Sequence, residues 1–144
     1  MTDIVDRATR SRMMAHIRSR DTAPELAVRR ELHSLGIRYR LHDEKLPGRP
    51  DIVIKRLRTV IFVHGCFWHR HPGCRLAYTP KSNVDFWLRK LEGNVARDRV
   101  NQSRLAELGW RVLTIWECET RNHEALREQL AQWLALEHGE RITG

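Results

Sequence analysis

Residues 59–74 read TVIFVHGCFWHRHPGC, and this stretch decides the fold of the chain. It opens with a strongly apolar run, Thr59 to Val63, that is short enough for a central β-strand. The strand leads into His64–Cys74, eleven residues that hold three of the eight histidines, two of the three cysteines and the adjoining rings of Phe67 and Trp68. Metal ligands and titratable imidazoles therefore gather at a strand end, with two large aromatic side chains between them. This combination indicates chemistry on a charged, aromatic polymer.

The composition favours a single domain with a polyanionic partner. Its 144 residues are 41% hydrophobic, which is enough for a real core. Lys+Arg 26 against Asp+Glu 18 gives a net charge of +8, which favours nucleic acid first, or an anionic membrane surface. Arginine supplies 22 of these 26 positive charges and binds phosphate bidentately, although a GC-rich genome would also raise its share. No apolar run spans a membrane, and the N-terminus lacks the apolar stretch of a signal peptide, so we expect a cytoplasmic protein.

Hydrophobic periodicity predicts a mixed α/β sandwich around one sheet. Helices are expected over residues 22–35, 84–108 and 124–137, and strands over residues 37–42, 51–54, 59–63 and 110–116. Thr22 and Glu25 form the pattern of a capping box at the start of the first helix. The expected inner stripe of the long helix is Val84, Trp87, Leu88, Leu91, Val95, Leu105 and Leu108. Residues 1–20 are basic and form a helix or arm, which either lies on a phosphate backbone or is a solvated terminus.

Several titratable side chains stand where a catalytic site could be built. Asp51 opens a strand after a turn, and it can bind Mg²⁺, a hard cation that prefers oxygen, or simply cap the turn. Asp98 falls on the inner stripe of the long helix, where a charged side chain needs an imidazole, a metal or an arginine as partner. His64 and His69 can take a proton from water or hold a phosphate, and we expect His69 to pair with Asp98. Glu25 is ambiguous, since its capping role fully accounts for it locally.

The spacing of cysteine and histidine predicts a structural zinc site. Cys66, His71 and Cys74 have C-x4-H-x2-C spacing, and Cys118 would join them from the end of a neighbouring strand. Spacing alone does not separate His71 from His69 as the ligand, and unligated buried cysteine is the alternative. An odd number of cysteines without a secretory signal argues against a disulfide framework.

Three aromatic side chains are candidates for a wedge between base pairs. Phe67 and Trp68 lie inside the proposed metal loop, where burial is hard to arrange, and Trp87 lies on the long helix. Trp87 can instead belong to the core, because it sits on the inner stripe of that helix.

Four segments resemble the very-short-patch mismatch repair endonucleases: LPGRPDIVI (46–54), VIFVHGCFWHRHPGC (60–74), FWLRKLEGNVARDR (86–99) and LGWRVLTIWEC (108–118). The N-terminal ATRSRMM and RDTAPE also fit, so the resemblance covers the chain from about Ala8 to Cys118. It implies a restriction-endonuclease-like (PD-(D/E)XK) single domain, with a mixed central sheet flanked by helices. It also implies a DNA mismatch repair endonuclease that nicks one strand 5′ to the T of a T·G pair arising from deaminated 5-methylcytosine, by Mg²⁺-dependent hydrolysis.

The resemblance also assigns roles to single residues. Asp51 and the main-chain carbonyl of Val63 would bind Mg²⁺, with Glu25 in support. His69, oriented by Asp98, would activate water, and His64 would contact the phosphate. The four ligands of a structural zinc would be Cys66, His71, Cys74 and Cys118. The DNA contacts would be Phe67, Trp68 and Trp87 from the major groove, Met14 of the N-terminal arm from the minor groove, and Lys90 near the mismatched pair.

The chain departs from the general nuclease pattern at two positions and from the repair family at one. Phe62 stands where that pattern has its second acid, and His64 where it has lysine, as in the repair family itself. Val63 replaces the threonine expected from the resemblance, and a carbonyl ligand survives that change.

Two other functions fit the same residues. One is a broader mismatch or restriction-type endonuclease, and the other is a zinc-stapled DNA-binding module without catalysis. We expect an arm over residues 1–20, an endonuclease domain over residues 21–144 and double-stranded DNA with a T·G mismatch as the partner. Mismatch-repair proteins are further candidate partners, and no membrane is expected. Cleavage of one strand favours a monomer.

Overall fold

The computed structural model describes residues 21–138, with side chains for residues 21–134. The arm expected over residues 1–20, Met14 included, lies outside the described residues. The helices are α2 (Ala23–Ser34), α3 (Val84–Glu107) and α4 (His123–His138), and two 3-10 turns are η1 (Lys55–Leu57) and η2 (Glu117–Thr120). The strands are β1 (Arg40–Leu41), β2 (Ile52–Ile54), β3 (Thr59–His64) and β4 (Arg111–Trp116). No helix among residues 21–138 combines the length and the apolar character that a membrane crossing would need.

The four strands form one mixed sheet in the order β1-β2-β3-β4. The β2–β3 hairpin is antiparallel, as expected, with Val53 opposite Val60. β3 and β4 are parallel, with Ile61 opposite Leu113, and α3 forms the crossover between them. The predicted mixed sheet flanked by helices is therefore confirmed.

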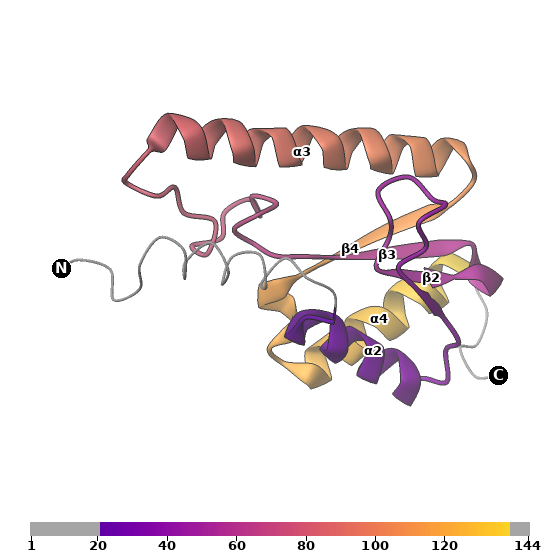
Figure 1. Ribbon diagram of the computed structural model, residues 1–144. Coiled ribbons are helices and arrows are strands. Elements are labelled where there is room, and N and C mark those ends of the chain that lie inside the picture. Colours follow the sequence, from indigo (N-terminus) through magenta and orange to yellow (C-terminus); the bar gives the residue numbers. More distant parts are fainter. Residues whose placement is uncertain (1–20, 139–144) are drawn as a thin grey trace.

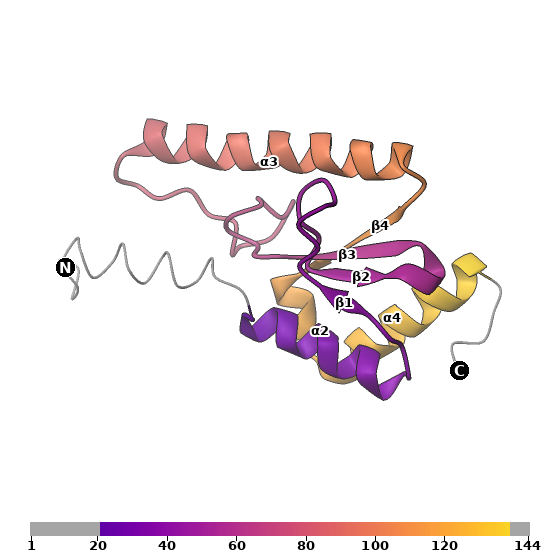
Figure 2. The same ribbon diagram turned by 45° about the vertical axis from the view of Figure 1, so that its right-hand side comes forward.

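Helices cover both faces of the sheet. Figure 1 shows α3 along one face and α2 with α4 on the other, and Figure 2 shows the same layers in a second view. Side chains of a strand alternate between faces, and β2 follows this rule: Ile52 and Ile54 pack in the core with α2 and α4, whereas Val53 packs with Leu105 of α3. The segment between β3 and α3 lies beneath the N-terminal half of α3 in both views.

Two expectations about the elements were wrong in extent. The strand expected over residues 37–42 has only two residues, Arg40 and Leu41, and both are exposed. It is an edge strand that pairs with β2 alone, so little of it is held in the sheet. On α3, Val84 is 41% exposed rather than buried, because the N-terminal end of the helix extends past the sheet, and Leu108, directly after the helix, is 54% exposed.

Candidate active site and metal centre

A carboxylate and a main-chain segment meet where β3 ends. Asp51 directly precedes β2, and its Oδ2 accepts a hydrogen bond from the backbone N–H of Val63 at 2.7 Å. The N–H and C=O of one strand residue point to the same edge of the strand. The Val63 carbonyl therefore faces the same side as the Asp51 carboxylate, and the two predicted oxygen ligands are brought together.

Asp51 shares its surroundings with a second carboxylate, that of Glu25. Burial raises the pKa of Asp51 to about 7; the hydrogen bond from Val63 opposes this shift, and the nearby Glu25 adds to it. Two carboxylates that are withdrawn from water repel each other unless a proton or a cation lies between them. Their oxygen atoms, together with a carbonyl, suit a hard divalent cation.

Glu25 is part of a buried network rather than a complete capping box. Thr22 Oγ1 accepts the Glu25 N–H at 3.4 Å, as expected, but the Glu25 carboxylate takes the N–H of Asp21 instead of that of Thr22. Its Oε2 also accepts from Arg29 Nη2 at 3.0 Å and lies 3.0 Å from His42 Nε2. Capping alone therefore does not explain Glu25, because a residue 17 positions later in the chain binds the same carboxylate.

The structure brings together His64, His69 and Asp98. His69 Nδ1 lies 2.6 Å from Asp98 Oδ2, and the His64 ring stacks on the His69 ring with centroids 3.7 Å apart. A carboxylate at Nδ1 places the ring proton there and leaves Nε2 of His69 as the acceptor. Burial first, and then the neighbouring His69, lower the pKa of His64 to about 3, so His64 is neutral at neutral pH.

Phe62 confirms that this site is not built on the general nuclease pattern. It stands where that pattern has its second acid, and its side chain is buried at 7% exposure, packed with Val60 and Leu105. The carboxylates near β3 come instead from α2 and α3, through Glu25 and Asp98.

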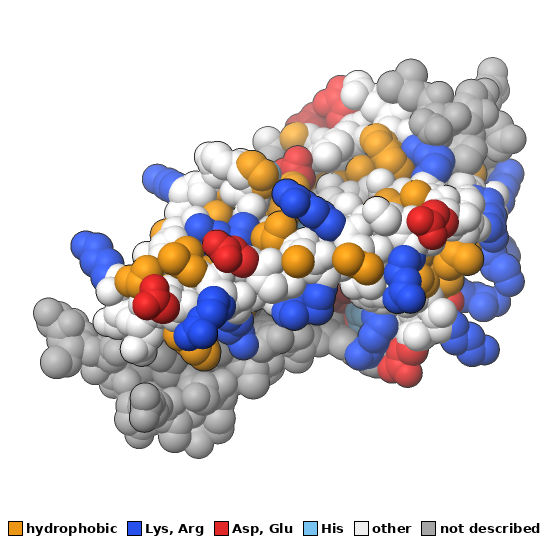
Figure 3. Space-filling view, turned by 90° about the horizontal axis from the view of Figure 1, so that it is seen from above, with side chains coloured by type: hydrophobic (Ala, Val, Ile, Leu, Met, Phe, Trp, Pro, Cys, Tyr) orange, Lys and Arg blue, Asp and Glu red, His pale blue; other side chains and the backbone are white. Residues whose placement is uncertain are grey.

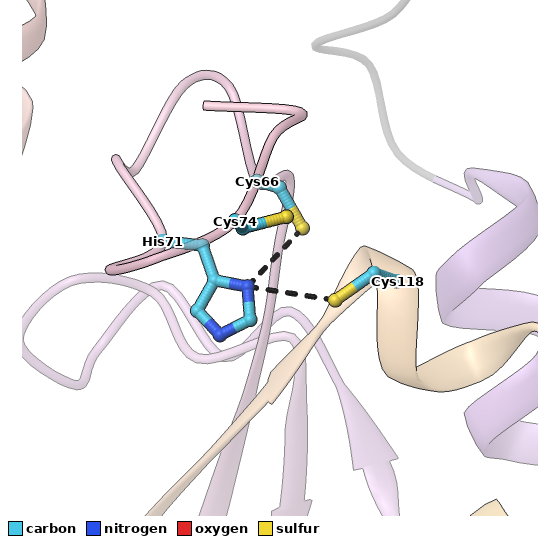
Figure 4. Close-up of side chains that lie close together, drawn as sticks. All are labelled: Cys66, His71, Cys74 and Cys118. Carbon is cyan, nitrogen blue, oxygen red and sulfur yellow. Dashed lines mark hydrogen bonds between the residues drawn. The ribbon is translucent and has the colours of Figure 1, made fainter. Parts of the chain in front are cut away.

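The four predicted zinc ligands converge on one point (Figure 4). The ligand atoms of Cys66, His71, Cys74 and Cys118 all lie within 4.8 Å of one another. His71 Nδ1 is 3.6 Å from Cys66 Sγ and 3.5 Å from Cys118 Sγ. Tetrahedral zinc with ordinary bond lengths would place nitrogen and sulfur about 3.6 Å apart. The donor set and its spacing therefore fit zinc, with His71 rather than His69 in the cluster.

Thiolate formation at this cluster is governed by burial. Burial raises the pKa of Cys66 to about 12 and raises that of Cys118, whereas the backbone N–H of Leu76 lowers that of Cys74. Metal binding requires thiolates, so an ion at this cluster would displace protons. Cys118 lies in η2 and the other three ligands lie in the loop after β3, so an ion would join two distant segments.

Aromatic rings gather between that loop and the start of α3. Phe67 contacts Trp68, Tyr78 and Trp87, with ring centroids 5.0, 5.1 and 5.6 Å away. Trp87 also contacts Phe86, so it belongs to this cluster and not to the core. Tyr78 and Phe86 are 61% and 54% exposed. The cluster therefore carries two large rings that face solvent, neither of which was singled out from the sequence.

Polar contacts fix the backbone that carries these rings. Arg70 donates to the carbonyl oxygens of Ala77 and Tyr78 and to Thr79 Oγ1, at 3.0, 2.9 and 3.1 Å. Asn94 Nδ2 of α3 donates to the carbonyl of Trp68 at 3.0 Å. The signal for Asn94 was present in the sequence, because it precedes Asp98 by one helical turn and so shares its face.

The surface over α3 is mostly basic. Figure 3 looks onto this surface and shows lysine and arginine side chains spread over it, with fewer carboxylates. Lys90 lies on α3, one turn after Trp87, and is partly buried. A surface of this charge suits a phosphate backbone.

The fold and the sequence define the class of protein. The catalytic domain of the homing endonuclease I-Bth0305I has the same fold, with a TM-score of 0.56 and 22% sequence identity over 83% of this chain and all of that domain. The chain thus has a restriction-endonuclease-like fold. Residues 2–75 match the family model for DNA mismatch endonuclease Vsr.

Two curated relatives span nearly the whole chain. The type II nicking enzyme V.XorIIP of Xanthomonas oryzae pv. oryzae is 50% identical over 130 residues, which are 90% of this chain and 95% of the relative. The DNA mismatch endonuclease Vsr of Escherichia coli K12 is 49% identical over 142 residues, which are 95% of this chain and 90% of the relative. The chain belongs to the Vsr family of DNA mismatch endonucleases, and it is a DNA nicking endonuclease.

Proposed function

We propose that the protein nicks one DNA strand 5′ to the T of a T·G mismatch, of the kind formed when 5-methylcytosine deaminates, with Mg²⁺ as the catalytic ion. One observation carries the proposal: a continuous series of contacts joins the Asp51 carboxylate to the imidazole rings of His64 and His69 and, through them, to Asp98. Asp51 binds the Val63 N–H, His64 follows Val63 and stacks on His69, and His69 binds Asp98. The carboxylate proposed to bind the metal therefore contacts the start of residues 63–69, and the imidazole proposed as general base lies at the end of the same segment.

The residues divide the hydrolysis between them. Asp51 and the Val63 carbonyl would hold the cation, and Glu25 would add a second carboxylate beside Asp51. A bound Mg²⁺ supplies charge stabilisation to the attacking and leaving oxygens. His69 accepts the proton of the attacking water at Nε2, and Asp98 stabilises the imidazolium that results. His64 is neutral, so it contacts the phosphate as a hydrogen-bond donor rather than as a cation.

Mismatch recognition is assigned to the aromatic cluster. Phe67, Trp68 and Trp87 would enter the DNA from the major groove, at a cost of a few kcal/mol for each unstacked step. That cost is lower where the pair is already mismatched. Lys90 would lie near the mismatched pair, and Met14 of the N-terminal arm would approach from the minor groove. Zinc bound to Cys66, His71, Cys74 and Cys118 would hold the loop that carries two of the rings and take no part in hydrolysis.

A panel of duplexes tests the specificity. Nicking rates would be measured on T·G, on every other mismatch and on T·A, in several sequence contexts and with Mg²⁺ added or removed. T·G-selective nicking that needs Mg²⁺ supports the proposal. Equal rates on T·A would show a restriction-type enzyme, and equal rates on all mismatches a broad mismatch endonuclease.

The Asp51→Ala variant tests the site itself. We expect it to bind T·G duplex and to nick none, because it keeps the basic surface and loses the metal-binding carboxylate. Retained nicking would remove Asp51 from the mechanism. Sedimentation of the protein with and without duplex tests the proposed monomer, and mismatch-repair proteins are proposed as further partners to be tested in the same way.

A further inference from the structure

His42 links the two carboxylates of the proposed Mg²⁺ site. Its Nε2 lies 3.0 Å from Oε2 of Glu25, and its backbone N–H donates to the backbone carbonyl of Asp51 at 3.1 Å. The side chain of His42 is only 12% exposed, and that of Glu25 only 7%. One residue thus contacts both the carboxylate that comes from α2 and the backbone from which Asp51 projects.

The backbone of His42 adopts a conformation that is uncommon for residues other than glycine. It follows β1 directly and has a φ of +47°, in the left-handed region that residues with a β-carbon rarely adopt. Such conformations persist where surrounding contacts impose them, and they concentrate at functional sites. At His42 the contacts that impose it are those to Glu25 and Asp51.

The hydrogen bonds to Glu25 are unequally shared between its two oxygens. The N–H of Asp21, Arg29 Nη2 and His42 Nε2 all meet the carboxylate at Oε2. Arg29 also binds the carboxylate of Asp21, which is 63% exposed. His42 is the member of this group whose own backbone is tied to Asp51, so it fixes Glu25 relative to that residue.

We propose that His42 is a positioning residue for the catalytic cation. By holding Oε2 of Glu25, it keeps the remaining carboxylate oxygen available next to Asp51, so that the two carboxylates present a divalent-cation site in one geometry. The inference rests on the proposed use of Mg²⁺. It adds a residue to the site that is not itself a ligand and that does not touch the DNA.

Three variants separate positioning from general stability. His42→Asn is the main one, because asparagine tolerates the left-handed backbone well but its amide is too short to reach Glu25. His42→Gln restores a donor with longer reach. His33→Asn is the matched control, since His33 is exposed in the last turn of α2. The readouts are the Mg²⁺ concentration for half-maximal nicking and Mn²⁺ binding to the zinc-loaded protein without DNA, followed by electron paramagnetic resonance.

We expect His42→Asn to raise both the Mg²⁺ requirement and the Mn²⁺ dissociation constant about tenfold, the size of one hydrogen bond to a charged group. His42→Gln should return both to within about threefold of the wild type, and His33→Asn should match the wild type. Binding of T·G duplex without divalent cation should be unchanged.

A His42→Asn protein with wild-type values in both metal readouts would overturn the inference, as would a folded His42→Gln protein that is no better than His42→Asn. A wild type that nicks without Mg²⁺ would refute the proposed function instead, and the Mn²⁺ readout would still decide the role of His42.

Discussion

Two titratable groups of the site, Asp51 and His64, should oppose each other in the pH dependence of stability. Burial raises the pKa of Asp51 from 3.8 to about 7 and lowers that of His64 from 6.5 to about 3. Between pH 6.5 and 5 the folded protein therefore holds a proton on Asp51 that the unfolded chain lacks, so acidification stabilises the fold through this residue. Over the same range His64 is protonated in the unfolded chain but stays neutral in the folded protein, so acidification destabilises the fold through that residue.

The two contributions are close in size. Each has a limiting slope of about 1.4 kcal/mol per pH unit. From pH 6.5 to 5, proton-linkage integration gives about +2 kcal/mol for Asp51 and about −2 kcal/mol for His64 in the free energy of unfolding. These two contributions to the free energy of unfolding nearly cancel in the wild type. Each becomes measurable when the other residue is replaced.

Urea unfolding at pH 6.5 and pH 5, without added Mg²⁺, measures the effect. Asp51→Asn keeps an oxygen for the Val63 N–H and should lose about 2 kcal/mol more than the wild type on acidification. His64→Gln should gain about 2 kcal/mol relative to the wild type over the same step. The two variants should thus differ by about 4 kcal/mol in their pH response, a comparison from which the other titrating groups cancel. Parallel pH responses in all three proteins would refute the reasoning.

Three further predictions concern single parts of the site. Asp98→Asn should slow single-turnover nicking about 100-fold or more at unchanged DNA affinity, because an amide can donate to His69 Nδ1 and leave Nε2 protonated; a loss below threefold would contradict this role. Cys118→Ser should abolish zinc retention in a colorimetric metal assay and lower Tm by about 10 °C, whereas zinc retained at wild-type stoichiometry would exclude Cys118 as an essential ligand. Trp68→Ala should weaken T·G duplex binding about tenfold or more and leave nonspecific binding unchanged; equal losses on T·G and T·A duplexes would argue against a wedge.

The His69–Asp98 pair could be predicted because each residue carried its own local signal. A carboxylate on the inner stripe of an amphipathic helix needs a partner, and an imidazole at the end of a central strand lies near such a helix. The cluster of Cys66, His71, Cys74 and Cys118 was predictable for a related reason, since cysteines and histidines at short spacing restrict the possible arrangements. Spacing left His69 and His71 open, and the structure separates them by direction: one ring meets α3 and the other the cysteines.

Glu25 shows where local reasoning fails. The Thr22–Glu25 pattern satisfied a helix-capping rule, so the local pattern called for no further role, and only the family resemblance placed Glu25 at the site. The partners that matter lie elsewhere in the chain, and no periodicity connects Glu25 with His42 or Asp51. His42 itself was hidden inside an alternating pattern that predicts a strand, whereas its backbone leaves the strand region directly after Leu41.

Hydrophobic periodicity also does not predict how much of a helix or strand is covered by the rest of the fold. The spacing of apolar residues on α3 indicates which face turns inward, but not how far the sheet beneath it reaches. Leu91 and Leu105 are fully buried, whereas Val84, at the N-terminal end that extends past the sheet, is exposed, as is Leu108 directly after the helix. The part of α3 that overhangs is the part that meets the loop after β3, so the unsupported end of the helix is the end that holds the aromatic cluster.

With the proposed roles of Trp68 and His69, this arrangement would couple recognition to hydrolysis. Trp68 and His69 are neighbours in the chain, and α3 holds them through Asn94 and Asp98, one helical turn apart. A displacement of the Trp68 backbone on insertion into DNA would therefore move His69 relative to Asp98. The loop has few apolar residues of its own, so the cysteine cluster and the Arg70 contacts must supply the rigidity that a core would otherwise provide. If Trp68 inserts only at a weakened base step, as proposed, His69 would be placed for catalysis only at such a step, and selective binding would lead to selective cleavage.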